Sequence, residues 1–130
     1  MVSMTVQYRS DGKAAIGRAG EHEVIADRPS GKAGGEGRGF NGGELLALAI
    51  GGCFGNDVQY TADEMGLDVE ELSVTVTLDL DGSPLLATGA EMRVRCQLRN
   101  DGDPAELLRR AEERSTVANS VRAGFPVTIR

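Results

Sequence analysis

The sequence predicts an α+β fold in one domain over residues 1–130, with a mostly antiparallel sheet packed on a central helix. Three segments carry this prediction: residues 72–80 and 91–99 alternate between apolar and polar side chains, and residues 43–66 contain a long apolar run that leads to Gly66. Strict alternation is typical of a strand with one buried face, and a terminal glycine is typical of a helix end. Strands and helices follow one another in blocks, which favours α+β over a parallel α/β sheet.

Composition narrows the class of protein. The chain has 130 residues, a net charge of −6 and only 4% aromatic residues, with no tryptophan. The negative charge argues against a nucleic-acid surface. The longest apolar run is roughly half of what spans a bilayer, and Met1 is not followed by the basic stretch and apolar core of a secretory signal. Two cysteines do not suggest a disulfide framework, so we expect a cytoplasmic protein that binds neither nucleic acid nor a membrane.

The first half of the chain is expected to contain extended structure, a loop and a helix. Residues 3–27 read as strands around a turn at residues 10–12, and the glycine-rich stretch 28–43 reads as a long loop. In the helical segment 43–66, Gly51 and Gly52 predict a break between a short first helix and a second one that contains Cys53.

The second half is expected to contain a strand pair, two helices and a closing strand. Residues 72–80 and 91–99 should pair in antiparallel fashion. Asp103 and Pro104 resemble the N-cap and first position of a helix that runs to residue 114. A short helix over residues 115–122 and a strand over residues 125–129 complete the prediction.

Two familiar motifs do not fit their context. Gly37, Gly39 and Gly42 match the spacing of a dinucleotide-binding loop, but no buried strand precedes them. His22 is the only histidine, and no cluster of Cys, His or carboxylate residues surrounds it in the sequence. We therefore expect neither a cofactor nor a metal site.

The two cysteines lie in different patterns. Cys53 ends an apolar run, which predicts a thiol near a helix N-terminus in apolar surroundings. A helix N-terminus favours the thiolate, whereas apolar burial disfavours it. Cys96 is in phase with the apolar residues of its strand and is expected to be a small core residue.

The segment from Asn41 to Phe54, NGGELLALAIGGCF, resembles the signature around the reactive cysteine of the OsmC/Ohr family of thiol-dependent organic hydroperoxide reductases. The resemblance continues through both alternating segments, the helix at 104–114 and the segment from Ala111 to Ser120. It begins near Gly17 and Arg18, so it covers essentially the whole chain. It implies an OsmC-like fold assembled as an intertwined homodimer.

The resemblance also implies a mechanism. In the family, a cysteine thiolate attacks the peroxide and becomes a sulfenic acid, a second cysteine forms a disulfide with it, and an arginine and a glutamate support the thiolate. Cys53 matches the reactive cysteine, Arg18 matches the arginine (with Arg38 as the alternative), and Glu44 matches the second of two signature glutamates.

Two departures from the family pattern bear on function. Ser115 stands at the position of the second cysteine, and Gly43 stands at the first glutamate. Three functions therefore remain open: a peroxidase that uses Cys53 alone with an external thiol reductant, a non-catalytic protein that binds a small apolar ligand in the dimer groove, and a structural or interaction protein.

Overall fold

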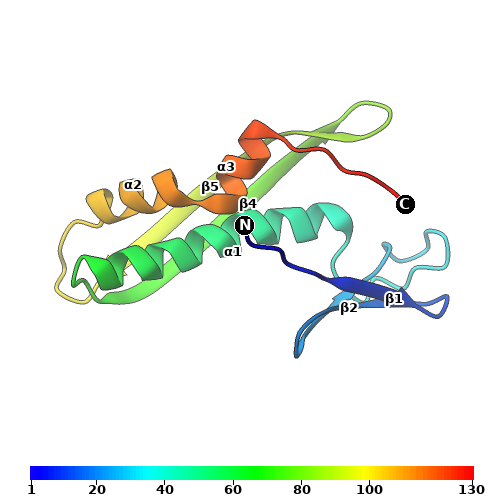
Figure 1. Ribbon diagram of the computed structural model, residues 1–130, viewed down its shortest axis with the longest axis horizontal. Coiled ribbons are helices and arrows are strands. Elements are labelled where there is room, and N and C mark those ends of the chain that lie inside the picture. The colour runs from blue at the N-terminus through cyan, green and yellow to red at the C-terminus, as the bar shows by residue number, and fades with distance from the viewer. The chain divides into compact units, whose positions relative to one another are not determined.

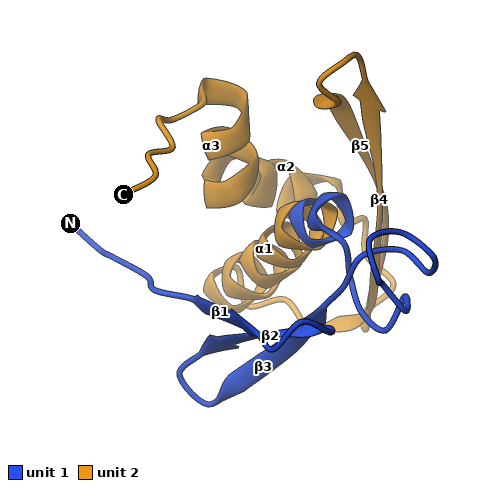
Figure 2. Cartoon of the chain, turned by 90° about the vertical axis from the view of Figure 1, so that its right-hand side faces the viewer, with its two compact units in different colours: residues 1–46 blue, residues 47–130 orange.

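The computed structural model describes residues 1–130 and contains three helices and five strands. In chain order these are β1 (Gln7–Ser10), β2 (Ala15–Ala19), β3 (His22–Ala26), α1 (Gly42–Glu64), β4 (Val69–Asp81), β5 (Leu86–Leu98), α2 (Ala105–Arg114) and α3 (Thr116–Ala123). The chain forms two compact units, residues 1–46 and residues 47–130 (Figure 2). The α+β class and the antiparallel pairing are as the sequence predicts.

The first unit is built on a three-stranded antiparallel sheet in the order β1-β2-β3. The turn between β1 and β2 is fixed by Ser10, whose hydroxyl accepts a hydrogen bond from the amide of Gly12 and donates one to the carbonyl of Lys13. A hydroxyl that bonds to nearby backbone groups favours a turn over continued strand. The predicted turn at residues 10–12 is confirmed.

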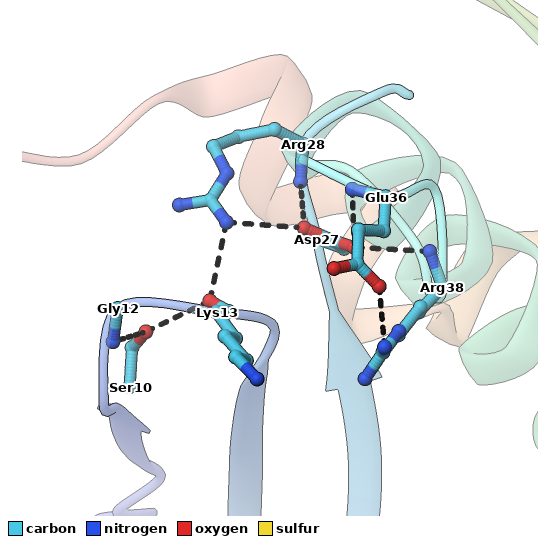
Figure 3. Close-up of polar contacts among 7 residues, drawn as sticks. All are labelled: Ser10, Gly12, Lys13, Asp27, Arg28, Glu36 and Arg38. Atoms are coloured by element: carbon cyan, nitrogen blue, oxygen red, sulfur yellow. Dashed lines mark hydrogen bonds and ion pairs between the residues drawn. The ribbon is translucent and has the colours of Figure 1, made fainter. Parts of the chain in front are cut away.

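Asp27 organises the glycine-rich loop that follows β3. Its side chain is fully buried and accepts hydrogen bonds from the backbone amides of Arg28, Glu36 and Arg38, at 2.7, 3.2 and 3.0 Å (Figure 3). The guanidinium of Arg28 lies 3.4 Å from the same carboxylate. These amides, led by that of Arg38, hold the pKa of Asp27 below its ordinary value, although burial opposes the shift.

Gly39 shows why this loop is rich in glycine. The loop returns to pair with the end of β3, and the amide of Phe40 donates to the carbonyl of Ile25 at 3.0 Å. A Cβ atom at Gly39 would lie only 2.1 Å from that carbonyl oxygen. The glycine therefore permits a close backbone approach, which is a different role from that of a phosphate-binding turn.

The second unit contains a long β4–β5 hairpin. Leu72 pairs with Cys96, Val74 with Val94, and Val76 with Met92, so the apolar residues of both strands lie on one face. The strand pair predicted from alternation is confirmed, and each strand is longer than the sequence pattern indicates.

Helices α1 and α2 pack on that face of the hairpin (Figure 1). The buried core consists of Phe54, Val58, Ala62, Leu98, Leu107 and Ala111. Its members come from α1, β5 and α2, because apolar residues recur at helical spacing on both helices. The core thus fixes the orientation of the second half of α1 on the sheet.

Helix α1 is continuous from Gly42 to Glu64, so the predicted break at Gly51 and Gly52 is wrong. A Cβ atom at Gly51 would lie 2.7 Å from Cγ2 of Val76. The glycine lets the helix approach β4 closely and does not interrupt the helix. No helix of the chain combines the length and the apolar character needed to cross a membrane.

The C-terminal part agrees with the prediction except at its end. Helix α2 begins directly after Pro104, with the amide of Ala105 donating to the Asp103 carboxylate at 3.0 Å. Residues 124–130 form no strand, so the predicted closing strand is wrong. In the single chain this segment has no neighbouring strand to pair with, and Val127 is 83% exposed.

Candidate functional site

Cys53 lies in the interior of α1, three turns after its first residue. The prediction that this thiol sits at a helix N-terminus is therefore wrong. The favourable field of a helix end fades within the first turn, so it gives a thiolate at this position little support. The side chain is partly exposed, and the thiol is free.

The thiol of Cys53 contacts a buried carboxylate. Its sulfur lies 3.6 Å from Oδ2 of Asp57, four residues later on the same helix face. Asp57 is only 9% exposed, and the thiol is the one hydrogen-bond donor to its side chain. Sulfur and carboxylate are thus held together by one rigid helix.

Arg114 brings a positive charge to this part of α1. It ends α2, and its guanidinium lies 2.8 Å from Oε2 of Glu64 and 3.5 Å from the hydroxyl of Thr61. The hydrogen bond and charge of Glu64 raise the pKa of Arg114, and the negative charge of Asp57 adds to that shift. Thr61 in turn donates to the carbonyl of Asp57 at 2.6 Å. The end of α2 is therefore tied to the helix that carries the thiol.

Ser115 follows Arg114 at the junction of α2 and α3. It is completely buried, and its hydroxyl oxygen has no hydrogen-bond partner. Burying a hydroxyl without a hydrogen-bond partner lowers the stability of the folded chain. Its expected position near Cys53, in place of a second cysteine, stays a prediction.

Cys96 lies on β5, opposite Leu72 of β4. It is partly buried against the core, and burial raises the pKa of its thiol. Its role as a small core residue agrees with the sequence prediction. Both cysteines are free, and no disulfide joins them.

The other two predicted site residues belong to the first unit. Arg18 lies on β2, where its Nε is 2.8 Å from Oε1 of Glu23 on β3.

Glu44 caps α1 together with Asn41: the amide of Asn41 donates to Glu44 at 3.0 Å, and the amide of Glu44 donates to Asn41 at 2.9 Å. This reciprocal pair is a capping box. The approach of Arg18 or Glu44 to Cys53 stays a prediction, as does that of Arg38, which pairs with Glu36.

Sequence reasoning overlooked Asp57 and the capping box. The capping box could have been predicted from the sequence, because Asn41 and Glu44 have the required spacing at the start of an apolar run. Asp57 also carried a signal, since it is the first charged residue after the apolar run and stands four positions after Cys53. Its burial depends on tertiary packing, which the sequence pattern does not describe.

Each unit also contains a cavity. In the second unit, a groove of about 670 Å³ lies among α1, β5, α2 and α3. Its apolar lining includes Ile50, Phe54, Met92 and Leu108, and charged residues such as Arg109 contribute to its walls. In the first unit, a smaller cavity of about 260 Å³ lies beside Tyr8, Arg28 and Phe40.

Comparison with known proteins identifies the family. The profile of the OsmC-like protein family matches residues 34–130. A comparison with curated proteins finds no match. An OsmC-like protein from Vibrio cholerae has a similar structure, with a TM-score of 0.79 at 14% identity over 92% of this chain and 94% of that chain.

Two further structures extend the likeness. An OsmC-like protein from Mycoplasma pneumoniae aligns with a TM-score of 0.77 at 13% identity, over 93% of this chain and 88% of that chain. The organic hydroperoxide resistance protein OhrB of Bacillus subtilis aligns with a TM-score of 0.57 at 23% identity, over 95% and 93%. At these identities the structures establish the common fold, and the profile match establishes the relationship. The chain belongs to the OsmC-like protein family.

Proposed function

We propose that this protein is a thiol-dependent peroxidase that reduces organic hydroperoxides through Cys53 and contributes to defence against oxidative stress. The observation that carries the proposal is the partly exposed Cys53 thiol in contact with the buried Asp57 carboxylate, within a chain of the OsmC-like family. Structural neighbours support it, since those from Bacillus subtilis and Legionella pneumophila are named organic hydroperoxide resistance proteins.

In the proposed reaction, the sulfur of Cys53 attacks the terminal oxygen of the hydroperoxide. A sulfur–oxygen bond forms, the oxygen–oxygen bond breaks, and the electron pair leaves with the organic oxygen as an alcohol. The sulfur is oxidised to a sulfenic acid and the peroxide is reduced. The net step is Cys–SH + ROOH → Cys–SOH + ROH.

An external thiol then restores the enzyme. Ser115 cannot form a disulfide, and Cys96 is held in the sheet with its thiol pKa raised by burial. A small thiol condenses with the sulfenic acid to give a mixed disulfide and water, and a second thiol releases Cys53. One cysteine thus suffices for turnover.

Arg18 and Glu44 complete the proposed site as the resemblance implies. A guanidinium beside sulfur would stabilise the thiolate, because opposite charges favour the ionised form. The capping box already gives Glu44 a structural role, so its catalytic role needs a separate test. We propose that the two compact units act as one OsmC-like domain.

We further propose that the protein is a homodimer. Apolar side chains alternate near both termini and are exposed in the single chain; they include Val2, Met4, Val6, Phe125, Val127 and Ile129. Burial of such a set against a second copy would remove apolar surface from water.

A hydroperoxide-consumption assay tests the function. The wild type with a dithiol reductant should consume tert-butyl hydroperoxide, Cys53→Ser should abolish consumption, and Cys96→Ser should leave it nearly unchanged. Equal rates for the wild type and Cys53→Ser would reject the peroxidase proposal.

A second function is favoured by one observation, the apolar groove of about 670 Å³ in the second unit. A groove of this size and lining suits a small apolar ligand. If the protein only binds such a ligand, a medium-chain fatty acid should bind with micromolar affinity in calorimetry, and Leu108→Asp should weaken binding while Cys53→Ser should not. Absence of binding would leave the peroxidase as the better account.

A further inference from the structure

The side chain of Asp57 is largely buried; Oδ2 contacts the Cys53 thiol, and Oδ1, which has no hydrogen-bond partner, reaches solvent. It is 9% exposed and accepts one side-chain contact, the 3.6 Å contact from the Cys53 thiol. Asp27 provides a comparison, since that buried carboxylate accepts three backbone amides and faces a guanidinium. Burying a carboxylate costs free energy unless donors compensate it. Asp57 therefore lacks the backbone amide donors that hold the Asp27 carboxylate in place, and its one hydrogen-bond donor is the Cys53 thiol.

The position of Asp57 suits a role in proton transfer. The contact joins residues i and i+4 of α1, and Phe54 and Val58 of the same turns are anchored in the core. The helix therefore holds Oδ2 beside the thiol without any rearrangement. A thiol is a weak donor, so its proton is the one that this carboxylate is placed to receive.

We propose that Asp57 is a catalytic residue that carries the thiol proton of Cys53 to the leaving oxygen of the hydroperoxide. This inference rests on the proposed peroxidase function and adds to it the path of the proton. As sulfur bonds to the terminal oxygen, Asp57 accepts the thiol proton. As the oxygen–oxygen bond breaks, Asp57 donates that proton to the organic oxygen, which leaves as the alcohol, and the carboxylate is regenerated.

Arg114 is a positioning residue in this scheme. Its charge acts on Asp57, while Glu64 holds the guanidinium in place at 2.8 Å. Thr61 links the two residues, because its hydroxyl lies 3.5 Å from the guanidinium and donates to the backbone carbonyl of Asp57 at 2.6 Å.

Two electrophiles separate proton transfer from the general reactivity of the thiol. An organic hydroperoxide expels an alkoxide, which needs a proton, whereas iodoacetamide expels iodide, which needs none. Asp57→Asn keeps the size of the side chain but cannot accept the proton, and it removes a negative charge beside the sulfur. We expect Asp57→Asn to react with tert-butyl hydroperoxide at least about 10-fold more slowly, as loss of a general acid–base group predicts. Its alkylation by iodoacetamide, which also requires loss of the thiol proton but needs no proton on the leaving group, should fall by a smaller factor.

Asp63→Asn is the matched control, because Asp63 is an exposed carboxylate on the same helix. It should alter neither rate. The inference is overturned if Asp57→Asn reacts with the hydroperoxide within twofold of the wild type, or if both of its rates fall in the same proportion. Failure of the proposed function itself would appear in the wild type, as normal alkylation of Cys53 without any reaction with hydroperoxide.

Variants of Arg114 keep the inference testable if Asp57→Asn does not fold, which far-ultraviolet circular dichroism will show. Arg114→Gln should slow the hydroperoxide reaction about 3- to 10-fold without slowing alkylation, within the usual range of general acid–base effects. Arg114→Lys should recover most of the loss. A wild-type hydroperoxide rate in Arg114→Gln would overturn the inference.

Discussion

The sulfur of Cys53 and Oδ2 of Asp57 are 3.6 Å apart on one face of α1, and the adjacent Phe54 and Val58 are packed in the core. The pair lies well inside the helix, so the helix end adds little to the chemistry of the thiol. A cation beside the sulfur would stabilise the thiolate. Two arginines are relevant: Arg18, which the family resemblance indicates, and Arg114, whose charge already acts on Asp57.

The close approach of α1 to β4 predicts opposite effects at two neighbouring glycines. At Gly51 an added methyl group would lie 2.7 Å from Cγ2 of Val76, whereas at Gly52 nothing lies within 4 Å. Gly52→Ala should raise the free energy of unfolding by about 0.5–1 kcal/mol, because alanine favours helix. Gly51→Ala should lower it by about 1 kcal/mol, because overpacking outweighs that gain. Urea unfolding measures both, and equal stability of the two variants would contradict the packing described here.

The capping box at the start of α1 predicts a loss of stability that is independent of catalysis. Asn41→Ala should lower the free energy of unfolding by about 1 kcal/mol, because a helix amide loses its acceptor. Glu44→Gln should keep the box, since glutamine also accepts from the amide of residue 41. If Glu44→Gln nonetheless abolishes peroxide consumption at unchanged stability, Glu44 is catalytic; if activity is kept, its role is the cap alone.

Asp27 predicts a pH-dependent contribution to stability. Its pKa is lowered in the folded protein, chiefly by the amide of Arg38. A carboxylate of this kind stabilises the fold above the pKa of the unfolded chain, about 4, and the contribution is lost as the pH falls through the folded-state value. The stability difference between the wild type and Asp27→Asn should therefore be full at pH 7 and shrink below about pH 4. Thermal melts at several pH values measure it, with Asp11→Asn, an exposed turn residue, as the control. A difference that is the same at pH 3 and pH 7 would refute this account.

The exposed C-terminal segment predicts the assembly of the protein. A charge on its apolar side should prevent burial against a second copy, because Val127 is apolar and 83% exposed in the single chain. Light scattering should give a dimer mass for the wild type and a monomer mass for Val127→Asp. Thr128→Asp places the same charge on the adjacent, polar position and should stay dimeric. A monomeric wild type would remove the dimer from the proposal.

Several elements were predictable because their signals are local. The alternation in residues 72–80 depends only on the strand period, and the helix after Pro104 depends on its cap. The predicted helix break at Gly51 was wrong for a physical reason. Low helix propensity is a local property of glycine, whereas the absence of a side chain at Gly51 matters because Val76, 25 positions along the chain, lies against it.

The site was predictable to a smaller extent. The sequence indicated Cys53 through an apolar run and a family resemblance, but not the partner of its thiol. The sequence alone suggests that Asp57 is an exposed charge, whereas packing of α1 against β5 and α2 leaves it only 9% exposed. The closing strand predicted at residues 125–129 is absent, because a strand needs a neighbour to pair with, which the single chain does not offer.

The most direct test of the central claim is mass spectrometry of unreduced peptides after the wild type has reacted with one equivalent of tert-butyl hydroperoxide in the presence of dimedone. We expect a dimedone adduct on Cys53, which reports a sulfenic acid, and an unmodified Cys96. A disulfide between Cys53 and Cys96, or a Cys53 that remains a free thiol while the hydroperoxide is consumed, would contradict it.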